Sequence, residues 1–96
     1  MPSTATTLTI EHLPQQGRFQ TIVNGHRCVC DYRLAGSVMH MLHTEVAPEL
    51  EGRGIAAALV AAALAHAQAH GLKINPLCSY VRGYMQRHPD TAALRA

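Results

Sequence analysis

The sequence is poor in aromatic residues and has little excess charge. It contains no Trp and only one Phe among 96 residues, so aliphatic side chains, Met and many Ala must build the core. Its formal net charge is +2, far below the basic surplus typical of proteins that bind a phosphate backbone. We therefore expect no nucleic-acid partner.

Long apolar runs are also missing. No stretch supplies the ~20 apolar residues of a membrane-spanning helix, and the N-terminal residues lack the basic start and apolar run of a signal peptide. We therefore expect a cytoplasmic protein with no membrane partner. The three Cys are an odd number, which favours free thiols over a disulfide framework.

The length allows a single domain, expected over residues 1–96 with a core at about 7–90. A chain of this size buries too little surface to enclose a large cofactor, so such a group must lie across a surface cleft. The sequence carries no signature of oligomeric state.

The N-terminal half has the pattern of an antiparallel meander. Residues 6–12 alternate apolar and polar residues as a β-strand does, and residues 18–23, 26–34 and 38–46 are further candidate strands. The dipeptide Asn24-Gly25 favours a two-residue type I′ hairpin, because both positions tolerate positive φ. Short connections throughout predict that consecutive strands pair.

The C-terminal half predicts a strand between two helices. Ala-rich residues 55–70 form the first helix, and residues 72–78 read as a strand. A helix that joins strands 38–46 and 72–78 makes them parallel, and Pro76 favours a sheet edge for the second. A short helix over 79–88 follows.

The ends of that short helix are marked by two residues. Ser79 is predicted to cap its start, and Pro89 is predicted to stop it. We expect a loose tail beyond Pro89.

A glycine-rich loop precedes the long helix. Gly52 and Gly54 allow a tight turn, and the unpaired N–H groups of a first helical turn attract phosphate. The loop is neither a Walker A sequence nor a dinucleotide fingerprint. Taken alone, it is equally consistent with a flexible helix cap.

The motifs around this loop resemble those of the GNAT superfamily of N-acetyltransferases. The superfamily's pyrophosphate loop reads Gln/Arg-x-x-Gly-x-Gly/Ala, and Glu51 stands where Gln or Arg is usual. The minimal single-domain GNAT-like family of about a hundred residues commonly has Glu there, and the resemblance to it covers about residues 7–90. Its motifs here are His43-Thr44-Glu45-Val46, Pro48-Glu49-Leu50-Glu51-Gly52-Arg53-Gly54, Pro76-Leu77-Cys78 and Arg87-His88-Pro89.

The resemblance implies an α/β (α+β) fold. It has a mostly antiparallel sheet, a splayed parallel pair made by strands 38–46 and 72–78, one long helix and one short one. It also implies acetyl-CoA as cosubstrate and transfer of its acetyl group to a primary amine of an unidentified small molecule or protein. The implied cosubstrate-binding residues are Glu45, Val46, Glu51, Gly52, Arg53, Gly54, Ile55, Ala56, Cys78 and Tyr80.

Five side chains are candidates for the chemistry. Cys78, at the family's Cys position, could accept the acetyl group or only contact the thioester; a small buried hydrophobe is the alternative. Tyr84 could protonate the departing thiolate, as could Tyr80, unless either is a core aromatic. His43 and Glu45 alternate onto one strand face, where either could accept the amine proton or both could form only a polar pair.

Metal binding is not expected. Cys28 and Cys30 share one strand face, but no further Cys or His completes a zinc spacing. His66 and His70 are one helical turn apart without a third ligand, which favours an exposed stripe. The sequence therefore predicts no metal site.

Two rival functions stay open. Ordinary GNAT enzymes build the acceptor side from two helices, for which residues 13–37 leave little room. A CoA-binding or acyl-CoA-binding module with little turnover is therefore the main alternative. A protein-interaction domain that keeps only the fold is the other.

Overall fold

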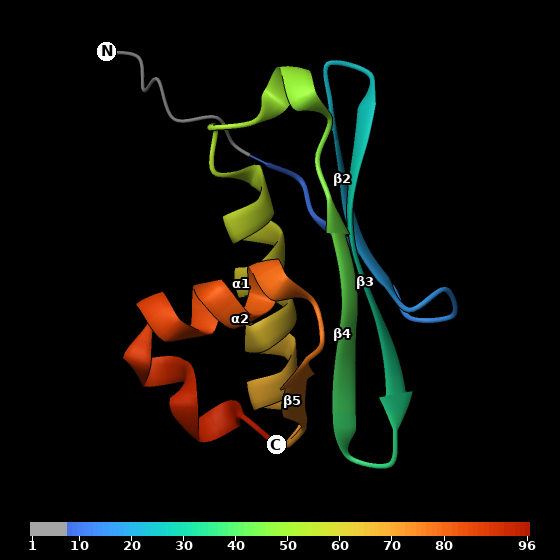
Figure 1. Cartoon of the computed structure of the whole chain (residues 1–96). Helices are drawn as coiled ribbons and strands as arrows, with labels where there is room; N and C mark the ends of the chain where they lie inside the picture. The colour runs from blue at the N-terminus through green and yellow to red at the C-terminus, as the bar shows by residue number, and fades with distance from the viewer. Residues whose placement is uncertain (1–7) are drawn as a thin grey trace.

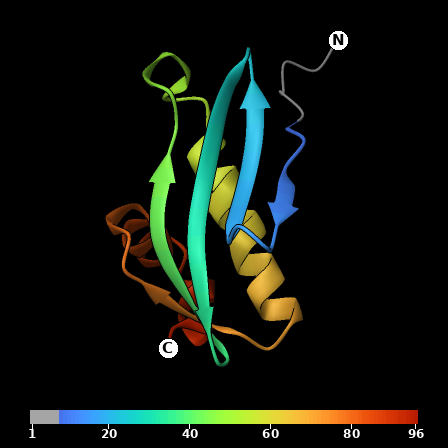
Figure 2. The same cartoon turned by 90° about the vertical axis from the view of Figure 1, so that its right-hand side faces the viewer.

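The computed structural model describes residues 8–96 and contains one five-stranded sheet. The helices all cover one face of this sheet, and the other face is uncovered (Figures 1 and 2). The strands are β1 (Glu11–Leu13), β2 (Arg18–Val23), β3 (His26–Ala35), β4 (Val38–Glu45) and β5 (Lys73–Pro76), and the helices are η1 (Pro48–Leu50), α1 (Ile55–Ala69), α2 (Ser79–Arg87) and η2 (Pro89–Leu94).

The sheet order is β1-β2-β3-β4-β5, and the first three pairs are antiparallel. The β2–β3 hairpin turns at Asn24 and Gly25, both with positive φ (51° and 78°), as a type I′ turn requires. The fourth pair, β4 with β5, is parallel. The predicted α/β fold with a mostly antiparallel sheet and one parallel pair is confirmed.

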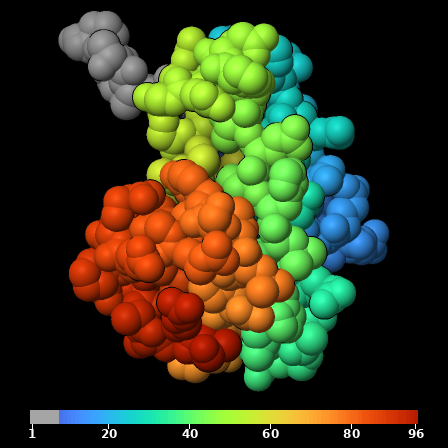
Figure 3. Space-filling view, viewed as in Figure 1, coloured from blue at the N-terminus to red at the C-terminus, as the bar shows by residue number. Residues whose placement is uncertain are grey.

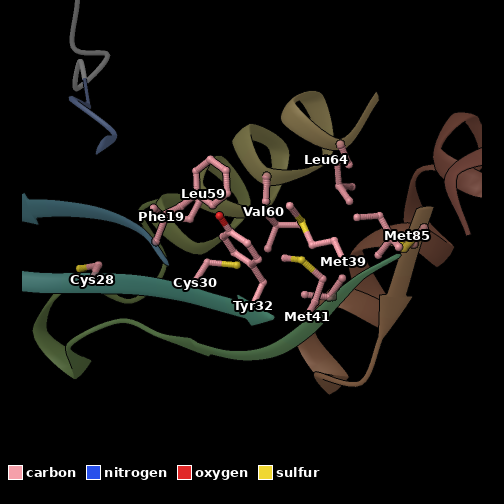
Figure 4. Close-up of a cluster of buried hydrophobic side chains, with 14 of the residues drawn as sticks. Phe19, Cys28, Cys30, Tyr32, Met39, Met41, Leu59, Val60, Leu64 and Met85 are labelled. Atoms are coloured by element: carbon pink, nitrogen blue, oxygen red, sulfur yellow. The ribbon is translucent and has the colours of Figure 1, made fainter. Parts of the chain in front are cut away.

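Helix α1 makes the crossover between β4 and β5 and supplies much of the core. Leu59, Val60 and Ala63 are fully buried in it, and their small or aliphatic side chains let the helix lie close to the sheet. Met39 and Met41 of β4 fill the space beneath the helix (Figure 4). Flexible Met side chains here replace the aromatic residues that the sequence lacks.

Strand β5 is shorter than predicted. It covers Lys73–Pro76 rather than 72–78, because Pro76 has no N–H to continue the ladder and the Leu77 N–H turns back to the Asn75 carbonyl at 3.0 Å. The predicted edge position is confirmed.

The N-terminal strand also differs from its prediction. Residues 8–10 are not in a strand, and β1 extends only over Glu11–Leu13. Residues 6 and 7 of the predicted segment lie outside the described residues.

The prediction of a loose tail is wrong. After η2, the Ala96 N–H donates to the Ile74 carbonyl at 2.8 Å, and Arg95 forms a parallel bridge with Ile74. The Lys73 ammonium also donates to the Ala93 carbonyl at 2.8 Å. The backbone groups on the open side of β5 hold this segment, a contact that no local pattern encodes.

The predicted cap at Ser79 is wrong as well. Cys78 is the N-cap residue of α2, Ser79 is the first helical residue, and no side chain caps the helix. In residues 8–96, no helix has the length and apolarity needed to cross a membrane.

Candidate functional site

The strands β4 and β5 separate partway along their length. Their paired register ends at Met41 and Pro76, and a hydrogen bond from the Cys78 N–H to the Met41 carbonyl, 2.9 Å, holds the point of separation. Past it, β4 continues to Glu45 while the other chain turns into α2. The last residues of β4 therefore have no β5 partner.

A pocket of about 550 Å³ opens at this separation. Figure 3 shows the surface hollowed where the yellow-green loop before α1 approaches the orange α2. Apart from Arg53 and Cys78, every residue predicted to bind the cosubstrate lines it, and Thr44 and Leu50 line it in addition. The lining residues are Thr44, Glu45, Val46, Leu50, Glu51, Gly52, Gly54, Ile55, Ala56 and Tyr80.

The start of helix α1 forms one wall of the pocket. Gly54 is its N-cap residue with φ 78°, and no side chain caps the helix or places an acid in its first turn. The first ladder bond joins the Ala58 N–H to the Gly54 carbonyl at 3.0 Å. The amides of Ile55 and Ala56 therefore stay free to donate to an anion, which the helix dipole also favours.

Inside the separation, Cys78 is half-buried and contacts β4. Its Sγ donates to the Thr44 hydroxyl at 3.6 Å, and that hydroxyl donates to the Cys30 sulfur at 3.8 Å. Burial raises the pKa of the Cys30 thiol to about 11. All three cysteines are free, as predicted, and Cys28 and Cys30 both point into the core.

His43 and Glu45 lie on the uncovered sheet face. The His43 Nε2 is 3.2 Å from the Glu45 Oε1, and both side chains are more than half exposed. Thr44 between them points toward the helices, as alternation along a strand requires. A bulge places Leu42 without a partner on β3, just before this pair.

The two candidate tyrosines lie at different places on α2. Tyr80 lines the pocket, and the Arg87 guanidinium lies 5.9 Å from the centre of its ring. Tyr84 stacks on His88 at 4.0 Å and lines a separate groove of about 240 Å³ beside η2. One further helical turn therefore carries Tyr84 out of the pocket.

Comparison with known proteins agrees with this geometry. Residues 18–94 match the family profile described as GCN5-related N-acetyl-transferase. The chain belongs to this family. The match covers every strand and helix except β1.

Relatives of this GCN5-related chain include Protein NATD1 from mouse, 34% identical over 85 residues that are 85% of this chain and 77% of the relative. Human Protein NATD1 is 33% identical and matches over 85% of this chain and 75% of the relative. A GCN5-like acetyltransferase candidate from Staphylococcus aureus, solved by NMR in solution, has the same fold. Its TM-score is 0.75 at 24% identity, over 93% of this chain and 88% of that one.

A histidine cluster lies away from the pocket of this GCN5-related domain. His66 is half-buried rather than part of an exposed stripe, because its ring packs 4.4 Å from that of His12 and 4.1 Å from that of His70. His12 also stacks on Phe19 at 4.1 Å and hydrogen-bonds the Tyr32 hydroxyl at 2.5 Å.

The environment of His12 and His66 disfavours their protonation. Burial, followed by the charges of His66 and His70, lowers the pKa of His12 below its ordinary 6.5. Burial and His70 likewise lower the pKa of His66. In the described part of the chain, no three His, Cys, Asp or Glu side chains are placed to hold a metal ion.

Thr44 and Leu50 are the pocket residues that sequence reasoning missed. Thr44 stands between the two candidates His43 and Glu45, so strand alternation places it on the face opposite to theirs. The bulge at Leu42 makes this the helix side, and simple alternation from the buried Met39 and Met41 would have predicted the reverse. Leu50, buried in η1, carries no comparable signal, because its place depends on how the loop folds onto the core.

Proposed function

We propose that this chain is an acetyl-CoA-dependent N-acetyltransferase that acts on a primary amine. The observation that carries the proposal is the pocket at the separation of β4 and β5, with an open strand edge on one side and an uncapped helix start on the other. Its volume, about 550 Å³, falls within the range of roughly 300–1,000 Å³ that ligand sites have.

The residues present fit the cosubstrate. The amides of Gly54, Ile55 and Ala56 would donate to the pyrophosphate, a mode that needs no basic side chain. The backbone of Glu45 and Val46 would pair with the pantetheine amides as an added strand does. Acetyl-CoA supplies an acetyl group activated as a thioester.

The two proton transfers would take place on opposite faces of the sheet, at the separation of β4 and β5. Glu45, oriented by His43, would accept the proton of the amine from the uncovered face. Tyr80 would donate a proton to the departing thiolate, and we assign this role to it rather than to Tyr84 because Tyr80 lines the pocket. Backbone groups of β4 at the Leu42 bulge would polarise the thioester carbonyl.

A second candidate function is a CoA-binding module with little turnover. The observation that favours it is the uncovered sheet face, where His43 and Glu45 are exposed (Figure 2). An acceptor bound there would be enclosed much less than the 70–90% typical of small-molecule ligands.

The melting temperature in the presence of acetyl-CoA tests both candidates. At a hundred times its Kd, acetyl-CoA adds about 2.7 kcal/mol to the stability, which raises Tm by roughly 10–20 °C in a domain of this size. Gly54→Trp, which fills the open space at the helix start, should abolish this rise. No rise in the unsubstituted protein would contradict both candidates.

A matched control exists at the opposite end of β4. Gly36 also has positive φ and open space around it, so Gly36→Trp introduces the same backbone strain away from the pocket and should keep the acetyl-CoA effect. Release of CoA across a panel of amines and peptides then separates the candidates. Binding without release by any acceptor would favour the module.

A further inference from the structure

Beneath the pocket, three polar side chains form one hydrogen-bonded row. The Cys78 Sγ lies 3.6 Å from the Thr44 Oγ1, and the Thr44 Oγ1 lies 3.8 Å from the Cys30 Sγ. Thr44 lines the pocket and is the cross-strand partner of Cys30. Its hydroxyl is therefore the link between a half-buried thiol at the separation and a thiol inside the core.

The two thiols at the ends of this row differ in accessibility. Cys30 has no exposed surface, and its sulfur lies on the helix side of the sheet (Figure 4). Burial raises the pKa of Cys30 to about 11, so this end of the row keeps its proton at neutral pH. Cys78 is partly exposed and lies at the N-cap of α2.

We propose that Thr44 is a positioning residue for Cys78. The Thr44 hydroxyl accepts a hydrogen bond from the Cys78 thiol, and it turns to donate one to the Cys78 sulfur when the thiol ionises. A hydroxyl rotates freely between donor and acceptor roles. As it turns, the Cys30 S–H becomes the donor to the Thr44 oxygen, so each member of the row keeps a partner. The inference rests on the proposed function only in that Cys78 lies at the separation of β4 and β5, where acetyl transfer is proposed.

Alkylation by iodoacetamide tests this without any cosubstrate. The Cys78 thiolate attacks the reagent's methylene carbon, forms a thioether and releases iodide. Cys28 and Cys30 have no exposed surface, so the native protein reports Cys78. The rate is measured from pH 6 to 10 by mass spectrometry.

The Thr44→Val variant removes the hydroxyl and keeps the side-chain shape. We expect its alkylation rate at pH 7 to fall about tenfold, the effect of losing one hydrogen bond to a charged sulfur, and its pH profile to move to higher pH. Thr44→Ser should stay within about twofold of the unsubstituted protein. Thr21→Val is the matched control, because the buried Thr21 hydroxyl donates to the Thr9 carbonyl at 2.8 Å and lies on β2, two strands away from Thr44.

Two results would overturn the proposal. One is a Thr44→Val profile that coincides with that of the unsubstituted protein, and the other is an equal displacement in Thr21→Val, which would indicate general loosening. If circular dichroism shows that Thr44→Val does not fold, Cys30→Ala tests the proposal through the other end of the row. We expect it to slow alkylation of Cys78 about twofold to threefold, and an unchanged alkylation rate would overturn the proposal. Failure of the proposed function is seen separately, as no change in Tm with acetyl-CoA.

Discussion

The two halves of strand β4 have different surroundings. Val38 to Met41 pair with strands on both sides, and Met39 and Met41 are fully buried beneath α1. Leu42 to Glu45 follow the separation from β5, and their side chains are exposed or line the pocket. One strand thus stabilises the core with its first half and offers free backbone groups with its second.

Substitution of neighbouring residues across this boundary should show the largest difference. Met41→Ala leaves a cavity in the closed half of β4, residues 38–41, which is paired on both sides. It should lower the free energy of unfolding by about 3 kcal/mol. Leu42→Ala, one residue further and 43% exposed, should change it by less than about 0.5 kcal/mol. Urea denaturation measures both, and equal losses would show that the boundary does not lie here.

In the open half of β4, residues 42–45, which has no β5 partner, substitution of Glu45 should affect turnover rather than stability. Glu45→Gln removes the proposed proton acceptor and should lower kcat/KM about 100-fold, with Tm unchanged because the side chain is exposed. Glu11→Gln removes the same charge on the same sheet face three strands away and is the control for loss of surface charge. Full activity of Glu45→Gln would remove Glu45 from the mechanism.

A side-chain hydrogen bond between Asn75 and His40, in the closed half of β4, should contribute a smaller amount to the free energy of unfolding. The Asn75 amide lies 3.0 Å from the His40 ring nitrogen, between β5 and β4. Asn75→Ala should lower the free energy of unfolding by about 1 kcal/mol and leave the acetyl-CoA effect on Tm in place. Leu77→Ala, just past the separation and 52% exposed, should cost almost nothing in the same urea titration.

The histidine cluster, remote from both halves of β4, should give the smallest effect. Because the folded-state pKa values of His12 and His66 lie below the ordinary 6.5, the unfolded chain binds protons more readily. The contribution of these two histidines to the free energy of unfolding is therefore complete above pH 6.5. It is lost as the pH falls from 6.5 through their lowered pKa values.

A comparison of urea midpoints at pH 7.5 and 5.5 measures this dependence. His66→Gln should reduce the difference between the two midpoints, because one titrating ring is removed and the His12 ring loses a charged neighbour. A difference as large as in the unsubstituted protein would assign the pH dependence to other groups.

Local patterns predicted the elements that depend on local chemistry. Asn24-Gly25 identified its hairpin, and the Ala-rich segment identified α1 with its glycine turn. The pocket wall at Gly54, Ile55 and Ala56 could be predicted for the same reason, since a helix start offers free amides wherever it lies in the fold.

Features that join distant segments could not be predicted in this way. The contact of Arg95 with Ile74 and the packing of His66 on His12 depend on how α1 and the C-terminal residues dock. The location of Tyr84 depends on how η2 packs beside α1, because residues of both elements line the second groove. Neither residue spacing nor helical periodicity contains this information.

The segment docked on β5 also affects association between molecules. An exposed strand edge is a template onto which a second chain can add. Here β1 spans three residues and β5 spans four, and Arg95 and Ala96 already occupy backbone groups of Ile74. A second chain that added to the sheet would therefore find few free backbone groups at either edge. The free edge of β4, by contrast, lies in a pocket that favours a slender ligand over another strand.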